Sequence, residues 1–261
     1  SAVIEPDEGR AKAAMSKAPS ATWYQNIEAA IAAEAMDAVL IATPGQFHEP
    51  VIMPAIAAGL PILCEKPLAP DSEISLRIAN AEIASGKQLI QVGFMRRFDA
   101  EYMQLRELIA SGSKGELLGL HCKHRNPDVP PTFFSEMLIF DSLVHEMDIV
   151  RFLTDSPIKS VEIKFFKQNS NSPEGVHEPI LALFETQSGV LANVEMNVSV
   201  RFGYQVKTEA VFENAIAEIG NTGGMRVAFE AELSTAEIIA GIRRATIAAK
   251  LSPVLTGSAF K

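Results

Sequence analysis

The chain has 261 residues, of which 48% are hydrophobic and 21% are charged. This length and composition suffice for one or two ordinary hydrophobic cores. The formal net charge is −9 and the sequence has no dense basic patch, which disfavours nucleic acid and anionic membrane surfaces as partners. The two cysteines, Cys64 and Cys122, lie far apart in strand-like runs. We therefore expect reduced, buried thiols and a cytoplasmic protein.

The first segment reads as the end of a strand followed by a helix. Ala-Val-Ile precedes Glu5-Pro6-Asp7, and the helix is expected over residues 8–17. Glu5 has two interpretations that the residues leave open. It is either an acidic group that binds a ribose at the end of a strand, or an exposed carboxylate favoured by the dipole of the helix that follows. A second helix is expected over residues 27–35.

A strand–helix–strand unit follows. Residues 37–44 form an apolar run that ends at Thr43-Pro44, residues 47–59 have a helical pattern that a glycine closes, and residues 60–64 form another strand. Glu65-Lys66-Pro67 comes next. Ligands bind at the carboxyl edge of an open α/β sheet, where a lysine beside a carboxylate can bind a hydroxyl and relay protons. The alternative is a solvated pair of surface charges.

Alternation of helices and strands continues beyond Lys66. A helix over residues 71–85 leads to a strand over residues 89–94, and this order predicts a doubly wound parallel sheet. Arg96 and Arg97 follow that strand, ahead of a helix over residues 102–110. We expect these arginines to form interdomain ion pairs or to lie near a cofactor, with solvated charge as the alternative.

A second unit is expected to begin with an alternating strand over residues 117–123, which ends in the polar run His124-Arg125-Asn126-Pro127. Beyond the helical segment described next, strands are expected over residues 161–166, 180–185, 190–200 and 208–219, separated by turns rich in Ser, Asn, Gly and Pro. A helix followed by such strands predicts an antiparallel sheet. Tyr204 falls on a connection within this region.

The amphipathic segment over residues 140–153 carries the second concentration of reactive side chains. Asp141, His145 and Asp148 stand at i, i+4 and i+7, which places them on one face of a helix. A carboxylate beside a histidine orients the ring and stabilises the imidazolium, as expected for a general base in alcohol oxidation. A surface ion-pair pattern is the alternative. A metal site ranks lower, because the sequence supplies no ligand-spaced Cys or second His pair to complete it.

Several motifs together resemble the glucose-fructose oxidoreductase and inositol dehydrogenase family. They are Ile41-Ala42-Thr43-Pro44 with His48, Cys64-Glu65-Lys66-Pro67, and the Asp-x-x-x-His of Asp141 and His145. The resemblance covers roughly residues 1–227, and the run at residues 124–127 is closest to the inositol dehydrogenase branch. It implies an NAD-dependent oxidation of a hydroxyl on a cyclic polyol or sugar, most specifically myo-inositol, in a homo-oligomer (dimer or tetramer) without a metal. It also implies a cis bond before Pro67.

The resemblance assigns roles to individual residues. Lys66, Asp141 and His145 are the expected catalytic residues: His145 takes the hydroxyl proton, Lys66 positions the oxygen, and Asp141 orients the polyol or the histidine. Tyr204 could hydrogen-bond a substrate hydroxyl or, alternatively, pack on the core. Cofactor contacts are implied for Glu5, Thr43, Pro44, His48, Glu65 and Lys66, and substrate contacts for His124, Asn126, Asp141, His145 and Tyr204.

The sequence departs from the family pattern at both ends. No Gly-x-Gly-x-x-Gly run for a pyrophosphate occurs in the chain. The expected fold is therefore an amino-terminally incomplete Rossmann-type parallel sheet, short of one strand and one helix, followed by an α+β domain with an open, mainly antiparallel sheet. The expected division is residues 1–115, 116–229 and an atypical tail, 230–261, part of which resembles a segment of translation elongation factor G.

Three functions stay open on these grounds. The first is an NAD-dependent polyol dehydrogenase. The second is a sugar-binding or regulatory homologue without catalysis, and the third is a truncated or chimeric chain that has no activity of its own. We expect the chain without a glycine loop to be poorly soluble or inactive by itself.

Overall fold

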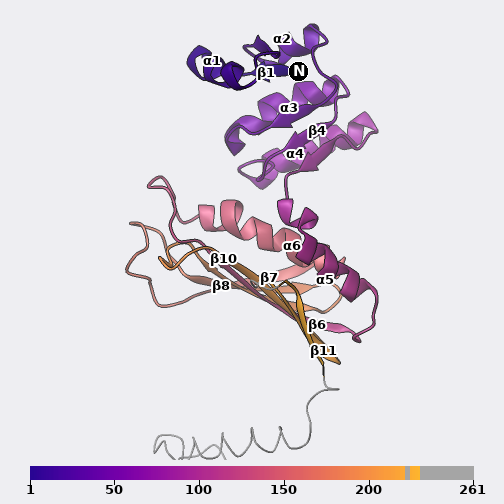
Figure 1. The fold of residues 1–261 in the computed structure, drawn as a ribbon, viewed down its shortest axis with the longest axis vertical. Helices are drawn as coiled ribbons and strands as arrows, with labels where there is room; N and C mark the ends of the chain where they lie inside the picture. The colour runs from indigo at the N-terminus through magenta and orange to yellow at the C-terminus, as the bar shows by residue number, and fades with distance from the viewer. Residues whose placement is uncertain (221–223, 230–261) are drawn as a thin grey trace, which may run out of the picture.

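The computed structural model describes residues 1–220 and 224–229, and it forms two units stacked along the long axis of the molecule (Figure 1). The tail, residues 230–261, and its expected likeness to elongation factor G lie outside the described residues. In the first unit, helices alternate with parallel strands. Its elements are β1 (Ala2–Ile4), α1 (Glu8–Lys17), β2 (Thr22–Tyr24), α2 (Ile27–Ala32), β3 (Val39–Ile41), η1 (Gly45–Phe47), α3 (His48–Ala57), β4 (Ile62–Cys64), α4 (Ser72–Ser85) and β5 (Ile90–Val92).

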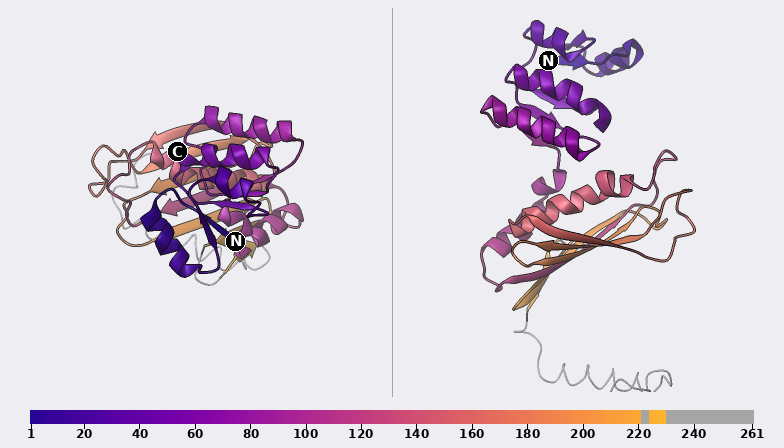
Figure 2. Two further views of the ribbon diagram at one scale, coloured as in Figure 1. Left: turned by 90° about the horizontal axis from the view of Figure 1, so that it is seen from above. Right: turned by 180° about the vertical axis from the view of Figure 1, so that it is seen from behind.

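The second unit places helices on one face of a large sheet. Two views from opposite sides show α5 and α6 on the face that is turned toward the first unit (Figures 1 and 2). Its elements, with the connecting turn η2, are η2 (Met95–Phe98), α5 (Ala100–Ala110), β6 (Leu117–Arg125), the π-helical turn η3 (Leu138–Leu143), α6 (Val144–Thr154), β7 (Ile158–Phe165), β8 (Ile180–Thr186), β9 (Leu191–Asn197), β10 (Gln205–Phe212), β11 (Ala215–Ile219) and β12 (Arg226–Phe229).

Short polar side chains begin four of the helices. Asp7, Asn26, Asp71 and Asp99 stand at the N-caps of α1, α2, α4 and α5, and each accepts a hydrogen bond from a backbone N–H of the first turn. Such caps satisfy donors that have no partner inside the helix, each worth about 1 kcal/mol. Gly86 ends α4 in the left-handed conformation, with φ of 69°, where glycine is favoured.

The parallel strands of the first unit fall into two groups. β3, β4 and β5 pair in that order, whereas β1 pairs only with β2 among the described strands. The core of this unit lies between the three-stranded sheet and helices α3 and α4, and it includes Ile41, Ile52, Cys64 and Ile78. The parallel alternation that the sequence predicts is confirmed.

The second unit contains a seven-stranded sheet in the order β12-β11-β10-β6-β9-β8-β7, in which only β6 and β9 pair in parallel. Side chains alternate between its faces, so that Ile180, Ala182 and Phe184 of β8 point into the core. The prediction of an open, mainly antiparallel sheet is therefore confirmed. A single strand over residues 208–219 is wrong in detail, because the chain turns at residues 213–214 and forms two strands, β10 and β11.

Helix α5 belongs with the second core. Its buried residues Tyr102 and Leu105 pack with Leu120 and Ile149 rather than with the first unit. Drawn by hydrophobic core, the division between the units falls before α5 and not at residue 115. The sequence pattern gives no sign of this, because an amphipathic helix shows that it has an apolar face but not which sheet will cover it.

Candidate active site

Lys66 is held at the carboxyl edge of β4 and reaches into the second unit. Its Nζ lies 2.9 Å from both the backbone oxygen and Oδ1 of Asp141, on η3. The two side chains are 20% and 40% exposed, so the pair sits at a partly open boundary. The Lys66–Pro67 bond is cis, as the family pattern implies. Lysine and aspartate, 75 residues apart, thus join the two units at one point.

A cavity of about 180 Å³ opens at this junction. It brings together all three expected catalytic residues and all the expected substrate-binding residues. Tyr204 lies at its wall with 63% of the residue exposed, which places the phenol at the cavity rather than in the core. The lining residues are Lys66, Met95, His124, Asn126, Asp141, Ser142, His145 and Tyr204.

His145 stands in the first turn of α6 and is 7% exposed. Its ring lies 6.3 Å, between centroids, from the rings of both Phe94 and His124. Burial, reinforced by the positive charges of Arg96 and Lys66, lowers the pKa of His145 to about 4. The ring is therefore neutral near pH 7, and its free nitrogen can accept a proton.

The expected stabilisation of the imidazolium by Asp141 is wrong in direction. The carboxylate of Asp141 binds Lys66 instead, and the described residues around His145 contribute mainly positive charge. Asp148 does not line the cavity and instead forms a bidentate pair with Arg97 at 2.6–3.0 Å. Within the described part of the chain, no three His, Cys, Asp or Glu side chains are arranged to hold a metal ion.

The expected cofactor contacts are dispersed. Thr43 and Pro44 follow β3, and Glu65 follows β4, so all three lie at the same sheet edge as Lys66. Glu5 ends β1, where its carboxylate accepts a hydrogen bond from Arg10 at 2.7 Å, and this bond is the main reason that its pKa is lowered. The structure brings none of these four side chains to the wall of the 180 Å³ cavity.

His48 occupies a different position from the one expected. The residue is fully buried, and its ring nitrogens lie 2.7 Å from the backbone oxygen of Thr43 and 3.2 Å from that of Leu68. Cys64 Sγ lies 3.3 Å from its Nδ1. A ring enclosed in this way cannot touch a cofactor, and its contacts instead tie together the segments that follow β3 and β4.

The sequence alone did not assign Arg96, Arg97 or Glu146 to the site. Arg96 is 6% exposed and pairs with the fully buried Glu146, while Arg97 pairs with Asp148. Both arginines therefore form ion pairs with α6 from the turn η2, which connects the two units. Glu146 follows His145 directly, and the only signal in the sequence is a third acidic residue in a helix that supplies two others.

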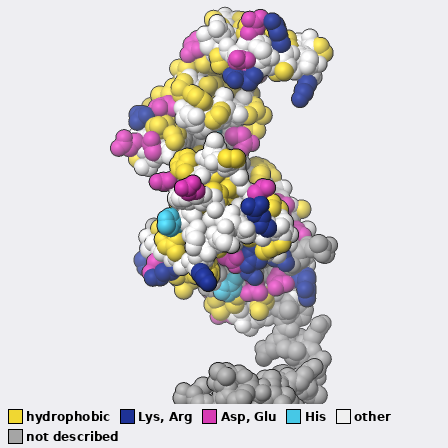
Figure 3. All heavy atoms as spheres, turned by 90° about the vertical axis from the view of Figure 1, so that its left-hand side faces the viewer, with side chains coloured by type: hydrophobic (Ala, Val, Ile, Leu, Met, Phe, Trp, Pro, Cys, Tyr) yellow, Lys and Arg dark blue, Asp and Glu magenta, His cyan; other side chains and the backbone are white. Residues whose placement is uncertain are grey.

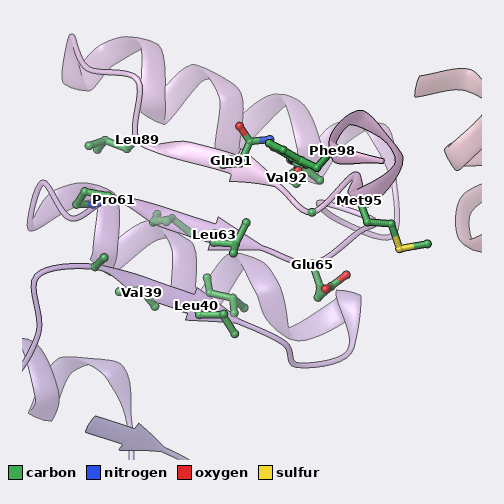
Figure 4. Close-up of a pocket in the computed structure, with 14 residues that line it drawn as sticks. Val39, Leu40, Pro61, Leu63, Glu65, Leu89, Gln91, Val92, Met95 and Phe98 are labelled. Carbon is green, nitrogen blue, oxygen red and sulfur yellow. Dashed lines mark hydrogen bonds between the residues drawn. The ribbon is translucent and has the colours of Figure 1, made fainter. Parts of the chain in front are cut away.

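A larger concavity covers one face of the three-stranded sheet. Its volume is about 780 Å³, and Figure 4 shows Leu40, Leu63 and Gln91 directed to the same side, with Phe98 beside them. Leu40 and Leu63 are 69% and 45% exposed. Yellow hydrophobic side chains are also prominent on the upper lobe in Figure 3. Glu65 and Met95 mark the end of this face nearest the second unit.

Family models match both units. Residues 1–94 match the "Oxidoreductase family, NAD-binding Rossmann fold", and residues 102–218 match the "GFO/IDH/MocA C-terminal domain". The Rossmann-type fold and the family's NAD cofactor agree with the expectation from sequence. None of the helices in the described ranges is long and apolar enough to cross a membrane.

Known proteins resemble the chain over most of its length. Inositol 2-dehydrogenase of Corynebacterium glutamicum is 58% identical over 226 residues, which are 87% of this chain and 67% of that protein. Inositol 2-dehydrogenase of Leifsonia xyli is 54% identical, with coverages of 91% and 70%. The structure of myo-inositol dehydrogenase from Lactobacillus casei with NAD(H) and myo-inositol is 30% identical, with a TM-score of 0.81 and coverages of 94% and 75%. The chain therefore belongs to the GFO/IDH/MocA family of NAD-binding oxidoreductases.

Proposed function

We propose that the protein is an NAD-dependent dehydrogenase that oxidises a hydroxyl group of myo-inositol. The observation that carries this proposal is the meeting of Lys66, Asp141 and His145 at one small cavity whose remaining wall is largely polar. A cyclic polyol presents hydroxyls that both donate and accept, and His124, Asn126 and Tyr204 supply matching groups. The names of the relatives from Corynebacterium and Leifsonia support the same substrate.

The proposed roles follow from charge and contact. Neutral His145 accepts the hydroxyl proton, since its lowered pKa leaves the ring unprotonated at working pH. Lys66 donates a hydrogen bond to the reacting oxygen, and Asp141 holds the ammonium group in place through contacts of 2.9 Å. The base and the positioning group come from different units, so the chemistry requires both units to be in their observed arrangement.

The carboxyl edge of β3 and β4 suits the nicotinamide end of NAD. Thr43, Pro44, Glu65 and Lys66 would hold it there, while His48 supports the two segments from behind. For Glu5, which follows β1, we propose a contact with the adenosine ribose. When bound, NAD supplies the hydride acceptor. The donors at this edge fit a ribose and an amide, whereas a pyrophosphate needs a glycine-rich loop that the sequence does not contain.

That loop has a natural place beside β3. Among the described strands, β3 pairs on one side only, and the apolar face of β3, β4 and β5 is uncovered (Figure 4). A strand, a Gly-x-Gly-x-x-Gly loop and a helix packed there would cover Leu40 and Leu63 and would bring backbone N–H groups to the sheet edge. We propose that tight binding of NAD requires such a unit.

A second copy of the chain is the proposed partner of the open sheet face. The side chains that point away from α5 and α6 include large exposed hydrophobic groups, interspersed with ion pairs such as Arg125–Glu195 and Lys159–Glu185. Mixed faces of this kind suit a homodimer or tetramer. Size-exclusion chromatography with light scattering measures the state. The hydrophobic residues are Leu118, Leu183, Leu191 and Ile216.

The location and the remaining partners follow from composition. The two cysteines of the sequence are both free and buried, which suits the reducing cytoplasm. The charge of −9 argues against nucleic acid and anionic membranes as partners. We therefore assign a small-molecule polyol as the ligand and the cytoplasm as the location.

The test of the proposed function is substrate-dependent reduction of NAD, followed by absorbance. The chain is assayed as it stands and with a strand–glycine-loop–helix segment joined upstream, using myo-inositol and glucose as competing substrates. We expect turnover of myo-inositol by the extended protein. Turnover of glucose alone would change the substrate, and no turnover of either would overturn the assignment. Equal activity of the chain as it stands would contradict the need for the added unit.

A further inference from the structure

Glu146, Arg96 and His124 form a buried cluster directly beneath the cavity wall. They come from α6, η2 and β6, and they are 0%, 6% and 4% exposed. Glu146 Oε1 binds Arg96 Nη1 and lies 3.1 Å from His124 Nδ1. Its other oxygen, Oε2, is buried without a hydrogen-bond partner in the described part of the chain. Only His124 of the three lines the 180 Å³ cavity together with Lys66 and His145.

The Nδ1 atom of His124 has two neighbours that make opposite demands. Glu146 Oε1 can only accept a hydrogen bond, so it requires a proton on Nδ1. Arg96 Nη2, at 3.2 Å, can only donate, so it requires a bare Nδ1. The two contacts cannot both be hydrogen bonds of one neutral ring, and each selects a different tautomer.

Charge decides between the two demands. Burial by itself raises the pKa of Glu146, but the hydrogen bond with His124 and the charge of Arg96 outweigh it, and the pKa is lowered. Glu146 is therefore an anion, and a hydrogen bond from N–H to a carboxylate is stronger than one between a guanidinium and a neutral ring nitrogen that also faces a carboxylate. Arg96 already has Glu146 as its partner.

We propose that Glu146 is a positioning residue that fixes His124 as the tautomer with its proton on Nδ1. Nε2 is then a bare acceptor and is the nitrogen left for the cavity that His124 lines. Lys66 can only donate hydrogen bonds, and Asp141 Oδ1 already accepts one from Lys66. His124 and His145 are the residues of this wall that can offer a ring nitrogen as an acceptor. A substrate hydroxyl that donates to His124 would thereby be oriented. The tautomer rests on the geometry alone, whereas its use in orienting a hydroxyl rests on the proposed function.

The experiment is nitrogen-15 NMR of the imidazole groups in the histidine-labelled full chain, with no substrate added. The sequence has five histidines, and loss of one signal set in His124→Gln assigns the residue. We expect Nδ1–H and a bare Nε2 in the unmodified protein. Glu146→Gln should populate the Nε2–H form, because Arg96 then dominates at Nδ1. A His124 that carries its proton on Nε2 before any substitution would overturn the proposal.

Two further variants separate positioning from general damage. Glu195→Gln removes a carboxylate that binds Arg125, the neighbour of His124 on β6, at 2.6 Å, and it should leave the tautomer of His124 unchanged. Glu146→Gln leaves the buried Arg96 without its counterion and can impair folding. The double variant Glu146→Gln/Arg96→Gln removes both charges, and it should lose the preference for Nδ1–H. An unchanged Nδ1–H tautomer in either folded variant would contradict the role of Glu146.

Kinetics then test the consequence for substrate. In protein that oxidises myo-inositol, Glu146→Gln should raise KM by about tenfold with a smaller change in kcat, which corresponds to the loss of one oriented hydrogen bond. An unchanged KM in a folded variant would show that the tautomer of His124 does not contribute to substrate binding. Absence of inositol turnover in the protein that carries the added strand–glycine-loop–helix segment would instead refute the proposed function, and the NMR result would be unaffected.

Discussion

The two units differ in how completely their own elements cover their sheets. In the second unit, α5 and α6 cover one face of seven strands, and the core residues Leu120, Val194 and Phe184 are at most 1% exposed. In the first unit, strands of three residues leave Leu40 and Leu63 exposed on one face. The proposed substrate-binding groups come largely from the second unit. The proposed cofactor contacts come from the first unit.

The largest expected effect comes from breaking the point where the units meet. Lys66→Ala should abolish turnover in a form of the protein that binds NAD, because the reacting oxygen and Asp141 both lose the ammonium group. NAD affinity should stay within about tenfold, or 1.4 kcal/mol. Steady-state assays and calorimetry measure the two quantities. Lys12→Ala, at an exposed ion pair of α1, serves as the control, and equal activity of both variants would remove Lys66 from the mechanism.

The variant His145→Asn tests whether the second unit supplies the base. It should reduce kcat strongly and remove the acid limb of the pH profile of kcat/KM, which we place near pH 4 because the base is lost as the ring protonates. The measurement is initial rate against pH. A variant profile that keeps the shape of the original would assign the base to another residue.

The same histidine gives a stability prediction with a defined sign. The pKa is about 4 in the folded state and ordinarily 6.5, so the unfolded chain binds the proton first as the pH falls. Stability is therefore lost as the pH falls from about 6.5 toward 4. Urea unfolding at several pH values should show a shallower loss in His145→Asn than in the unmodified protein. Parallel curves would show that His145 does not contribute.

Two substitutions directly test the difference between the buried sheet face of the second unit and the exposed sheet face of the first unit. Phe184→Ala empties a position that is 1% exposed and should lower the free energy of unfolding by about 3–5 kcal/mol. Leu40→Ala, at 69% exposure, should cost under about 0.5 kcal/mol. Denaturant unfolding compares them. A large loss at Leu40 would mean that this face is covered in solution.

The smallest expected effect is that of chelators. Hydride transfer as proposed needs no metal, and the carboxylates of Asp141 and Asp148 already bind Lys66 and Arg97. Incubation with a chelator should leave the rate unchanged. Activity that disappears and then returns with zinc would restore the metal interpretation of the helix.

Local patterns were sufficient for much of the fold. Caps such as Asp71, the strand ending at Cys64 and the alternation in β8 are decided by neighbouring residues, and each is readable from the sequence. Pairings across long separations are not. Arg96 and Glu146 are 50 residues apart, and nothing local distinguishes Glu146 from a solvated carboxylate.

The sequence was sufficient to predict which residues meet at the cavity, but not which partner each of them binds. Lys66, Asp141, His145, His124, Asn126 and Tyr204 do meet at one cavity. The partner that Asp141 takes depends on where the first unit places Lys66, and that choice reversed the expected effect on His145. His48 is of a residue type that often binds ligands, but backbone carbonyls from two loops enclose its ring. Only the folded chain brings these carbonyls together around the ring.

The π-helical turn at Leu138–Leu143 has a consequence for the evolution of this site. Val144 N–H donates to the oxygen of Ile139, five residues back, in place of the four-residue spacing of an α-helix. Loss of a single residue between Asp141 and His145 would restore α-helical spacing and change the angle between these two side chains about the helix axis. One codon deletion could therefore detach Asp141 from Lys66 while both residues persist. A descendant could change its chemistry in this way with every catalytic side chain still present in its sequence.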